Sequence, residues 1–502
     1  RSDRFDGNLT LAYNKTIDKH MLNVGVGSNI MQSETEGESF TGVGFINPDM
    51  IFIGAANAFQ ENTSPQGTYD KSRLVGFFTN VNYGYGNRYF LDFSFRSDGS
   101  SKFGRNSRFA PFWSLGVAWN VHNESFWHAH EKNALKLRAS VGSTGTTNFS
   151  STQALTTYLY DFSREYNGNF GVSLAGYGNS SLKWQTTLSY NVGVDFTFLH
   201  GLVVFNGDFY IKNTRSLLLP VTVAPSTGFI DYVENIGKLR NTGVEARLRF
   251  NLIQDAVKDL RWNVTLSAFH NRSKITQLSN QLETINQYAN DDRANQGTVV
   301  YRQFEAGRSQ TALMVVRSGG IDPATGNEIY IKRNGEMTFE YNHNDKIECG
   351  DMKPKIEGNV NTNLNWKGFN LYMLFKYQYG GKIYNATLAS KVEGVNPLKN
   401  ADKRVLYDRW KEPGDHAKFR RIDDTSAPYQ TTRLVFDNNL LALQSVSLSY
   451  ELPRKISQKM YMERVKLLLS STDLFRLSSV KQERGTSYPF ARTFSIGLNV
   501  TF

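Results

Sequence analysis

The chain ends in Arg492-Thr-Phe-Ser-Ile-Gly-Leu-Asn-Val-Thr-Phe502, in which apolar residues alternate with small or polar ones. A period of two sends successive side chains to opposite faces of a strand, so one face carries Phe494, Ile496, Leu498, Val500 and Phe502. This pattern is typical of the last strand of a membrane β-barrel, with the apolar face toward lipid and the polar face toward a wet lumen. A half-buried strand that closes a soluble sandwich fits the same residues, so this strand alone leaves both interpretations open.

Length and composition narrow the fold class. The 502 residues suit two to four ordinary domains or one large barrel. The chain is rich in strand-forming aromatics and in turn-forming glycine, with 34 Phe, 25 Tyr, 7 Trp and 41 Gly against 12 Pro. Its mean hydropathy of −0.44 excludes a helical membrane protein. It contains no run of about 18 apolar residues that could form a membrane-spanning helix. If the chain meets a membrane, it does so as strands.

Charge, cysteine content and the first residues exclude further classes. The net charge is +11, but the basic residues are dispersed and form no stripe with interleaved aromatics, which argues against nucleic-acid binding. Cys349 is the single cysteine, so no disulfide or thiolate metal cluster can form within the chain. The first residues, Arg1-Ser-Asp-Arg-Phe5, resemble neither a start methionine nor a signal peptide. We therefore expect the chain to begin within a longer protein.

The alternation of the last strand recurs along the whole chain. It predicts about fifteen strands, near 7–17, 20–33, 72–84, 87–98, 111–121, 134–144, 185–198, 201–213, 241–251, 260–272, 357–366, 369–380, 438–450, 464–472 and 492–502. The face opposite the apolar one carries Asp195, Arg247 and the alternate asparagines Asn359, Asn361, Asn363 and Asn365. Such a face suits a water-filled or polar-packed interior.

The lengths of the connections separate the barrel from the sandwich. If Phe502 lies at the periplasmic side, the short connections all fall there, including 18–19, 85–86, 199–200 and 367–368. The opposite, extracellular side then takes 99–110 and the long loops near 34–71, 145–184, 214–240, 273–356, 381–437 and 473–491. Transmembrane barrels alternate short and long connections in this way, and sandwiches have no reason to do so. The sequence therefore predicts a transmembrane antiparallel β-barrel in which residues 1–502 form a single barrel domain.

Local motifs along nearly the whole chain resemble those of the SusC/RagA-type TonB-dependent outer-membrane transporters, and their order and spacing carry the resemblance together. The motifs are Phe95-Arg-Ser-Asp-Gly-Ser-Ser-Lys-Phe-Gly104, Leu135-Lys-Leu-Arg-Ala-Ser-Val-Gly-Ser-Thr-Gly145, Ser181-Leu-Lys-Trp-Gln-Thr-Thr187, Gly228-Phe229, Asn235-Ile-Gly237, Asn241-Thr-Gly-Val-Glu245, Gly320-Ile-Asp-Pro-Ala-Thr-Gly326, Gly380-Gly-Lys-Ile-Tyr-Asn385, Arg409-Trp-Lys-Glu-Pro-Gly-Asp415, Leu448-Ser-Tyr-Glu-Leu-Pro453 and Tyr488-Pro489.

The resemblance implies a fold and a setting. The family's barrel has 22 strands around an N-terminal plug domain, so this chain resembles its C-terminal two-thirds, with the plug and the remaining strands on another chain or segment. An odd number of strands would place Arg1 in an extracellular loop, where proteases cut readily. We expect the chain start to mark a cut, a split subunit or a loop missing from an otherwise whole barrel. The setting implied is a Gram-negative outer membrane of the Bacteroidota type.

The resemblance also implies a function and partners. A SusC-like importer takes up a glycan or an oligopeptide with a SusD-like surface lipoprotein, is driven by TonB through the plug, and can form a dimer of transporter-lipoprotein pairs. No nucleic acid is expected as a partner. Two other classes stay open: a passive porin-like pore, and a secreted β-rich adhesion or scaffold protein. Specificity in such a system is set by loops, so the sequence does not identify the substrate.

The candidate ligand-binding residues lie on the long outer loops. Aromatic rings offer flat faces to sugars and peptides, and nearby carboxylates accept hydrogen bonds. The candidates are Tyr158, Tyr160, Phe162 and Tyr166 on one loop, and Tyr288, Asp291 and Asp292 on another. The alternative for the first group is that these rings form the core of their own loop or cover a partner lipoprotein.

Catalysis has little support in the sequence, and we expect no enzyme. Ser143 follows no nucleophile-elbow pattern, His128 and His130 have no third ligand at metal spacing, and the adjacent pair Asp423 and Asp424 would point apart on an extended backbone. Relatives carry a calcium-binding loop at the place of 334–346, but here Lys332 replaces its first Asp and Glu336 its second. We read this Ca²⁺ loop as degenerate and expect no metal or cofactor.

Overall fold

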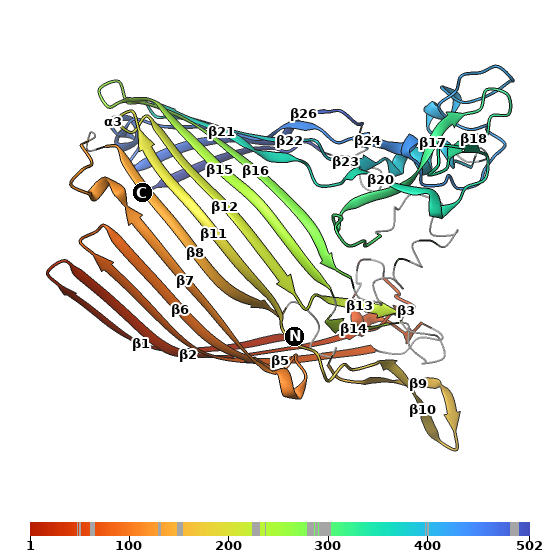
Figure 1. Cartoon of the computed structure of the whole chain (residues 1–502), viewed down its shortest axis with the longest axis horizontal. Helices are drawn as coiled ribbons and strands as arrows, with labels where there is room; N and C mark the ends of the chain where they lie inside the picture. The colour runs from red at the N-terminus through yellow and green to blue at the C-terminus, as the bar shows by residue number, and fades with distance from the viewer. Residues whose placement is uncertain are drawn as a thin grey trace. The chain divides into compact units, whose positions relative to one another are not determined.

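The computed structural model describes the chain except for residues 48, 50–51, 61–65, 129–131, 148–153, 223–230, 236, 279–285, 287–289, 291–302, 397, 399–400 and 482–490. Within the described residues one sheet of 15 strands dominates, and its strands are neighbours in chain order (Figure 1). In that order they are β1 (Ser2–Ile17), β2 (His20–Ser39), β5 (Gln66–Tyr85), β6 (Tyr89–Ser100), β7 (Phe109–Asn120), β8 (Ala134–Thr146), β11 (Gln185–Phe198), β12 (Val203–Arg215), β15 (Lys238–Asp255), β16 (Leu260–Gln277), β21 (Ile356–Trp366), β22 (Phe369–Tyr379), β25 (Leu440–Glu451), β26 (Arg464–Ser478) and β27 (Phe494–Thr501).

The sheet confirms the predicted all-β fold of about fifteen strands, because each observed strand overlaps one expected segment. The bounds differ most where the strands continue as polar hairpins. β2 and β5 remain paired from Thr35↔Asp70 to Ser39↔Gln66, beyond the last apolar alternation. A cross-strand ion pair of 2.8 Å between Lys71 Nζ and Glu34 Oε2 lies at the base of this extension. Polar cross-strand pairs leave no alternation of hydropathy in the sequence, so these ends could not be seen there.

Each strand pair of the sheet has one polar and one apolar face. The register pairs Asn8 of the edge strand β1 with Asn29 of β2, and Asn263 of β16 with Asn363 of β21 in the interior of the sheet. The opposite face is apolar and open to the surroundings. Ile496 is 85% exposed and Leu498 is 60% exposed. A soluble sandwich would bury these side chains, whereas a membrane barrel presents them to lipid.

The short connections all join neighbouring strands in tight hairpins. In the 367–368 turn both residues have positive φ, 46° at Lys367 and 85° at Gly368, as a two-residue hairpin turn between twisted strands requires. The connections 18–19, 86–88, 199–202 and 256–259 on the same side are also short, and 121–133 and 452–463 on that side are of moderate length. The longest connections, 278–355 and 380–439 among them, all lie on the opposite side, where 101–108 is the shortest. None of the helices among the described residues has the length and hydropathy needed to cross a membrane.

The chain divides into two compact units, which we describe separately. Unit 1 comprises Arg1–Val117, Ser140–Ser189 and Thr214–Ile236. It contains three two-stranded pairs in the long connections: β3 (Gly42–Val43) with β4 (Ala58–Phe59), β9 (Thr157–Tyr166) with β10 (Asn169–Gly176), and β13 (Leu218–Thr222) with β14 (Asp231–Asn235). Two 3-10 helices, η1 (Ile53–Ala55) and η2 (Arg105–Ser107), complete its described secondary structure outside the large sheet. A buried core cluster of this unit consists of Phe103, Phe112 and Trp184.

Unit 2 comprises Ala118–Ala139, Tyr190–Asn213 and Gly237–Phe502. Beyond the large sheet it contains a four-stranded sheet in the order β19 (Met337–Thr338), β18 (Glu328–Ile331), β17 (Ala312–Ile321) and β20 (Lys346–Asp351), and the pair β23 (Lys382–Tyr384) and β24 (Val435–Asp437). Its helices are η3 (Val121–Asn123), η5 (His343–Asp345), the π-helix η6 (Leu388–Glu393), η7 (Lys403–Leu406), η8 (Thr432–Leu434) and α3 (Arg454–Lys459). We call the described residues of 303–351 and 382–437 the loop module.

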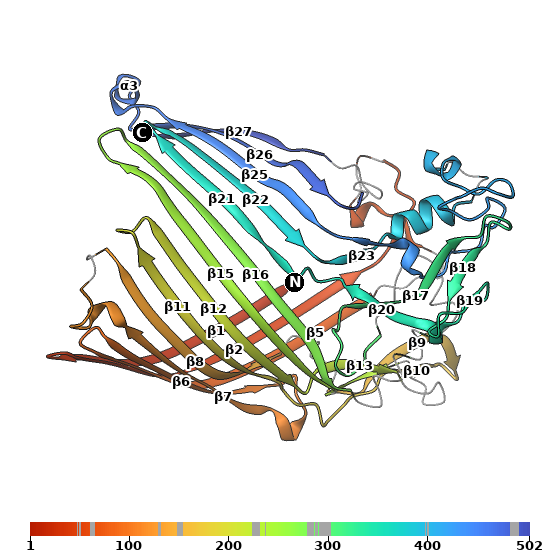
Figure 2. The same cartoon turned by 45° about the horizontal axis from the view of Figure 1, so that its top comes forward.

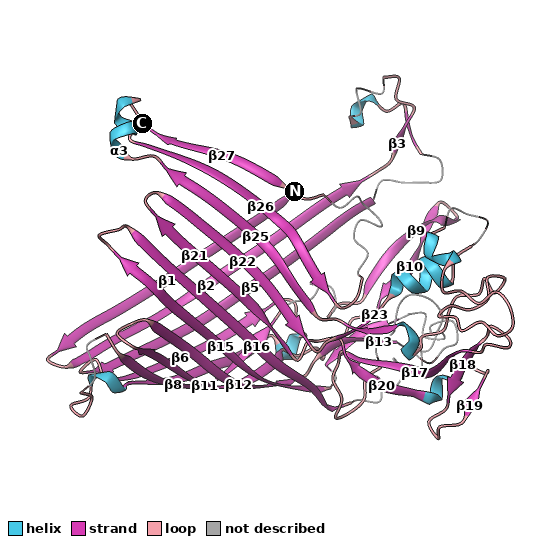
Figure 3. Ribbon diagram, turned by 90° about the horizontal axis from the view of Figure 1, so that it is seen from above, coloured by secondary structure: helices cyan, strands magenta, loops and turns pink. Residues whose placement is uncertain are grey.

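The loop module and α3 lie at opposite ends of the strands of unit 2. Figure 2 shows the four-stranded sheet beyond one end of β21, β22 and β25, and α3 at the other end. Figure 3 shows α3 beside the C-terminus. The module has its own core, because the residues Ala312 to Val316 of β17 are all buried. A second buried cluster, formed by Val392, Val405 and Phe419, lies within the 382–437 segment.

Candidate functional site

A cluster of charged side chains lies on the polar face of β8, β11 and β12. The guanidinium of Arg138 binds both oxygens of Asp195, at 2.8 and 3.0 Å, and both oxygens of Asp208, at 3.1 Å each. Asn206 Nδ2 donates a further hydrogen bond of 2.8 Å to Asp195 Oδ1. Paired forks between guanidinium and carboxylate are the strongest hydrogen-bonded ion pairs in proteins. This cluster fixes the position of three charges on the polar face of the unit 2 strands of the large sheet, which we call the wall.

Glycine makes room for the cluster. A Cβ atom at Gly193 would lie 2.5 Å from Asp208 Oδ1 and 2.7 Å from Arg138 Cζ. The charged groups therefore lie directly over the backbone of β11. A cavity of about 490 Å³ opens beside them and is also lined by Glu245, Arg247 and Asn361. The lining holds three acidic and two cationic side chains, so it is close to self-neutralised.

Amide side chains form a second feature of the polar face of unit 2. Asn370 Nδ2 donates to Asn363 Oδ1 at 3.0 Å and to Asn365 Oδ1 at 2.5 Å. Asn365 Nδ2 donates to Asn363 Oδ1 at 2.7 Å. These bonds join β21 to β22 across the face that the sequence predicted to be polar. The wall therefore offers uncharged donors and acceptors in a fixed array.

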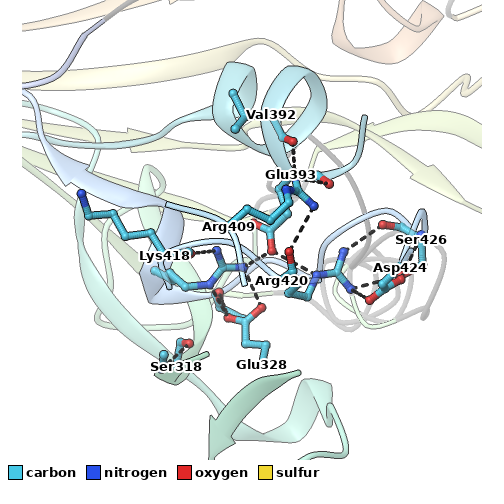
Figure 4. Close-up of polar contacts among 12 residues, drawn as sticks. Ser318, Glu328, Val392, Glu393, Arg409, Lys418, Arg420, Asp424 and Ser426 are labelled. Carbon is cyan, nitrogen blue, oxygen red and sulfur yellow. Dashed lines mark hydrogen bonds and ion pairs between the residues drawn. The ribbon is translucent and has the colours of Figure 1, made fainter. Parts of the chain in front are cut away.

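The loop module is held together by buried ions. Glu328, on β18, and Glu393, at the end of η6, are both almost fully buried. Arg433, on η8, bridges them: its Nη2 lies 2.9 Å from Glu328 Oε2 and 2.6 Å from Glu393 Oε1. Thr431 Oγ1 donates a hydrogen bond of 2.6 Å to Glu328 Oε1. Figure 4 shows Glu328 and Glu393 converging on this network from separate segments.

Arg420 extends the network. Its Nε lies 3.0 Å from Glu393 Oε1, and its Nη1 lies 2.5 Å from Asp424 Oδ2 (Figure 4). Its Nη2 donates to the Ser426 carbonyl oxygen at 2.9 Å. Two arginines, Arg420 and Arg433, thus share the three carboxylates of Glu328, Glu393 and Asp424. Removing one member of such a buried set leaves an uncompensated charge, so the set acts as a unit.

The electrostatics of the buried arginines differ with their partners. Burial alone would lower the pKa of Arg433, but the neighbouring carboxylates of Glu328 and Glu393 hold that pKa above its ordinary value. Burial lowers the pKa of Arg409, whose guanidinium donates mainly to backbone carbonyls such as those of Val392 and Val405. Arg433 thus joins separate segments through ion pairs, whereas Arg409 donates to buried backbone oxygens.

Motifs that lie far apart in the sequence meet pairwise in the loop module. Trp410 Nε1 donates to the Pro323 carbonyl oxygen at 2.9 Å, and the Gly414 amide donates to the same oxygen at 2.8 Å. The ring of Trp410 covers Gly326, where a Cβ would lie 2.6 Å from the indole. The 320–326 and 409–415 motifs therefore pack directly against each other.

In unit 1, sequence motifs also pack against each other around a tryptophan. Trp184 stacks on Phe103 with ring centroids 4.3 Å apart, and its Nε1 donates to the Arg108 carbonyl oxygen at 3.0 Å. Asn235 accepts a hydrogen bond from the Lys183 amide at 2.7 Å and donates to the Lys183 carbonyl at 2.8 Å. These contacts bring together the 95–104 motif, the 181–187 motif and Asn235.

The predicted ligand-binding residues are only partly described. Tyr158 lies on β9 and is 63% exposed, so its ring is available to a partner molecule. Tyr160, Phe162 and Tyr166 follow on the same strand, which pairs with β10, and their backbone alone is described. Tyr288, Asp291 and Asp292 lie outside the described residues. The structure thus places the first group on a single hairpin, and ligand binding by either group stays a prediction.

Several of the residues considered for catalysis or metal binding make other contacts, whereas His130 lies outside the described residues. Asp424 binds Arg420, whereas its neighbour Asp423 binds Arg421 at 3.0 Å, so the two carboxylates point to different partners. Lys332 Nζ lies 3.1 Å from Glu336 Oε2 across the turn between β18 and β19. An ammonium group therefore neutralises the carboxylate expected to face a calcium ion. Among the described residues, no three His, Cys, Asp or Glu side chains lie close enough together to hold a metal ion.

Comparison with known proteins places the chain in a family. The family model described as TonB dependent receptor-like, beta-barrel matches residues 1–328, well over half of the chain. The chain belongs to the TonB-dependent receptor β-barrel family, whose members are outer-membrane proteins. Its transmembrane barrel fold and outer-membrane location, both predicted from the sequence, are confirmed.

Individual relatives refine the comparison. TonB-dependent receptor P3 of Formosa agariphila is 26% identical over 98% of this chain and 52% of its own length. TonB-dependent receptor SusC of Bacteroides thetaiotaomicron is 27% identical over 64% of this chain and 32% of its own length. A solved chain of the RagAB peptide transporter superposes with a TM-score of 0.86 at 22% identity, covering 100% of this chain and 56% of the other. The chain spans about half the length of the curated relatives it matches.

The ionic clusters were not predicted as sites. Asp195 was expected on the polar face of its strand, but its pairing with Arg138 depends on two strands that are far apart in the sequence. A charged residue on the polar face of an expected strand is the signal that could have found it. Glu328, Glu393 and Arg433 carry no such signal, because they lie in connections without periodicity.

Proposed function

We propose that this chain forms the C-terminal part of the barrel of a TonB-dependent importer, with its polar face lining the path of the substrate. The observation that carries the proposal is the continuous polar face of β15, β16, β21 and β22, where amides and charges face one side and apolar side chains the other. A two-sided wall of this kind suits lipid on one side and a hydrated solute on the other.

The remainder of the barrel is part of the proposal. β1 and β27 each have one neighbour in the described sheet, so each has one edge of unpaired backbone groups. Lipid offers no hydrogen bonds to such an edge, and further strands must therefore cover it. We assign those strands and a plug domain to other parts of the whole protein. TonB would then act on the plug.

The long connections would face outward and meet a SusD-like lipoprotein. The supporting observation is that long and short connections alternate along the sheet, with the loop module among the long ones. The substrate would be a glycan or an oligopeptide. Tyr158, Tyr160, Phe162 and Tyr166 remain the proposed contacts on one hairpin, together with Tyr288, Asp291 and Asp292 on the 273–356 connection.

Uptake measurements in cells that carry the whole protein test this function. Cells are given fluorescent oligopeptides and oligosaccharides, with and without a protonmotive-force uncoupler, and are compared with cells lacking the gene. An importer shows gene-dependent uptake that the uncoupler abolishes, whereas a passive pore shows uptake that survives it. Gene-independent uptake of every probe would contradict both. Co-purification of a lipoprotein, followed by mass spectrometry of trapped small molecules, identifies the partner and the substrate.

A further inference from the structure

The end of unit 2 with the short connections carries a basic cavity. It measures about 790 Å³ and lies among the ends of β16, β21, β22, β25 and β26. Five cationic side chains line it, against two acidic ones: Arg261, Lys367, Arg454, Arg464 and Lys466, against Asp259 and Glu451. A wall cavity with this balance attracts anions.

The register places the polar residues of this cavity in two adjacent rows across the strands. Arg261 pairs with Asn365, Asn365 with Asn370, and Asn370 with Ser449, on four successive strands. The next row pairs Glu451 with Lys466. Directly opposed residues of an antiparallel sheet lie on the same face, about 5 Å apart, so one ligand can reach several of them.

Most of the positive side chains that line the first cavity have no acidic partner. Arg464 Nη2 lies 2.5 Å from Glu451 Oε2 and uses that carboxylate. Lys367 Nζ lies over the ring of Trp366, 5.9 Å from its centroid. Over the described part of the chain, the side chains of Arg261, Arg454 and Lys466 make neither a hydrogen bond nor an ion pair. These three side chains are therefore available to a ligand.

A second basic cavity adjoins the first. It measures about 440 Å³, shares Arg261, and is lined by Arg249, Asn251, Gln254 and Asn263 without a single carboxylate. The cavity beside Arg138 differs, because Asp195, Asp208 and Glu245 offset its two arginines. Of these three cavities, the two toward the short-connection end therefore carry an excess of positive charge, and the one beside Arg138 does not.

We propose that this basic strip, formed by Arg249, Arg261, Arg454 and Lys466 with the Asn365 and Asn370 amides between them, binds the anionic groups of an oligomeric substrate. The groups are carboxylates, sulfates or phosphates, which guanidinium forks and ammonium groups bind directly and amides supplement. The inference rests on the proposed function and deepens it, because it makes the substrate an oligomer that bears negative charge. An acidic peptide and an acidic glycan present the same chemistry to the strip.

Binding of charged and neutral probes tests the strip in the whole protein purified in detergent. The probes are hexaglutamate with hexaglutamine as its neutral counterpart, and a sulfated hexasaccharide with its unsulfated form, titrated at low ionic strength. We expect only the anionic probes to bind measurably, with an affinity that falls as salt is added. The R261Q/K466Q double variant weakens anionic binding on the order of tenfold, because it removes two charge-assisted contacts. The better of the two anionic probes tells a peptide from a glycan.

Lys258→Gln is the matched control, since Lys258 is a cation at the same end of unit 2, 74% exposed in its side chain, but lines neither cavity. It should change anionic binding less than about twofold. Equal binding of charged and neutral probes, or equal losses in R261Q/K466Q and K258Q, would overturn the proposal. So would a double variant that lowers the melting temperature without changing probe affinity, because the strip would then hold another segment of the same protein. Failure of uncoupler-sensitive uptake with probe binding intact would instead count against the proposed function alone.

Discussion

The wall of unit 2 and its loop module both use arginine and carboxylate pairs, but they use them in different surroundings. On the wall, Arg138 and its aspartates are each 25 to 33% exposed in their side chains and face a cavity. In the module, Glu328 and Glu393 are at most 1% exposed in theirs. Exposed pairs can exchange partners with water or a ligand, whereas buried ones hold segments together. The contrast assigns solute contact to the wall and rigidity to the module.

The largest expected effect comes from breaking the buried set. Glu393→Gln keeps the size of the side chain but leaves Arg420 and Arg433 facing a neutral amide. We expect the loop module to lose about 3–5 kcal/mol of stability, the usual cost of uncovering a buried charge. Hydrogen exchange by mass spectrometry should show faster exchange in 382–437 and unchanged exchange in β21 and β22. Unchanged protection of the module would mean that the network does not hold it.

The difference between wall and module also explains what the sequence could predict. The wall strands follow a period of two that is written into consecutive residues, so even the segment 185–198 was predicted with the bounds of β11. The module depends on partners far apart in the chain: Arg433 is 40 residues from Glu393 and 105 from Glu328. No local pattern encodes such pairs. Of the candidate site, the polar face could be predicted, whereas the ionic networks and the pairing of the motifs could not.

A second prediction tests whether the wall cluster tolerates crowding. Gly193→Ala would place a methyl group within 2.7 Å of both Asp208 and Arg138. The charged ends must shift, and we expect a loss of about 1–3 kcal/mol, as for other overpacked sites. The midpoint of thermal unfolding in detergent measures it. Gly25→Ala on β2 is the control, because its Cβ would meet no atom within 4 Å. Equal midpoints for the two variants would show that the cluster is not packed against β11.

A third prediction uses pH to separate the regions. Burial lowers the pKa of Lys346, at the start of β20, to about 8 from the 10.5 expected of an unfolded chain. Between these values the unfolded state binds more protons, so the module should become more stable as pH rises from about 8 toward 10.5. Below pH 8 both states are protonated, so the stability should no longer change with pH through this group.

Lys346→Met should therefore stabilise the module at neutral pH, by an amount that shrinks as the pH rises through that window. Hydrogen exchange of β17 and β20 at pH 7 and pH 9.5, corrected for the intrinsic rate, measures the difference. The wall strand β21 should show no corresponding change. A variant that protects the module equally at both pH values would place the origin of the stability change in packing rather than charge.

The smallest effect should come from an ion pair of the module that is exposed like those of the wall. The side chains of Arg421 and Asp423 are 44 and 67% exposed, although they adjoin the buried set. Asp423→Asn makes the same acid-to-amide change as Glu393→Gln, but water can solvate the arginine that it leaves. We therefore expect a loss below about 1 kcal/mol in the same exchange measurement. If the two variants cost the same, position within the module would matter and burial would not, and the contrast between wall and module would lose its physical basis.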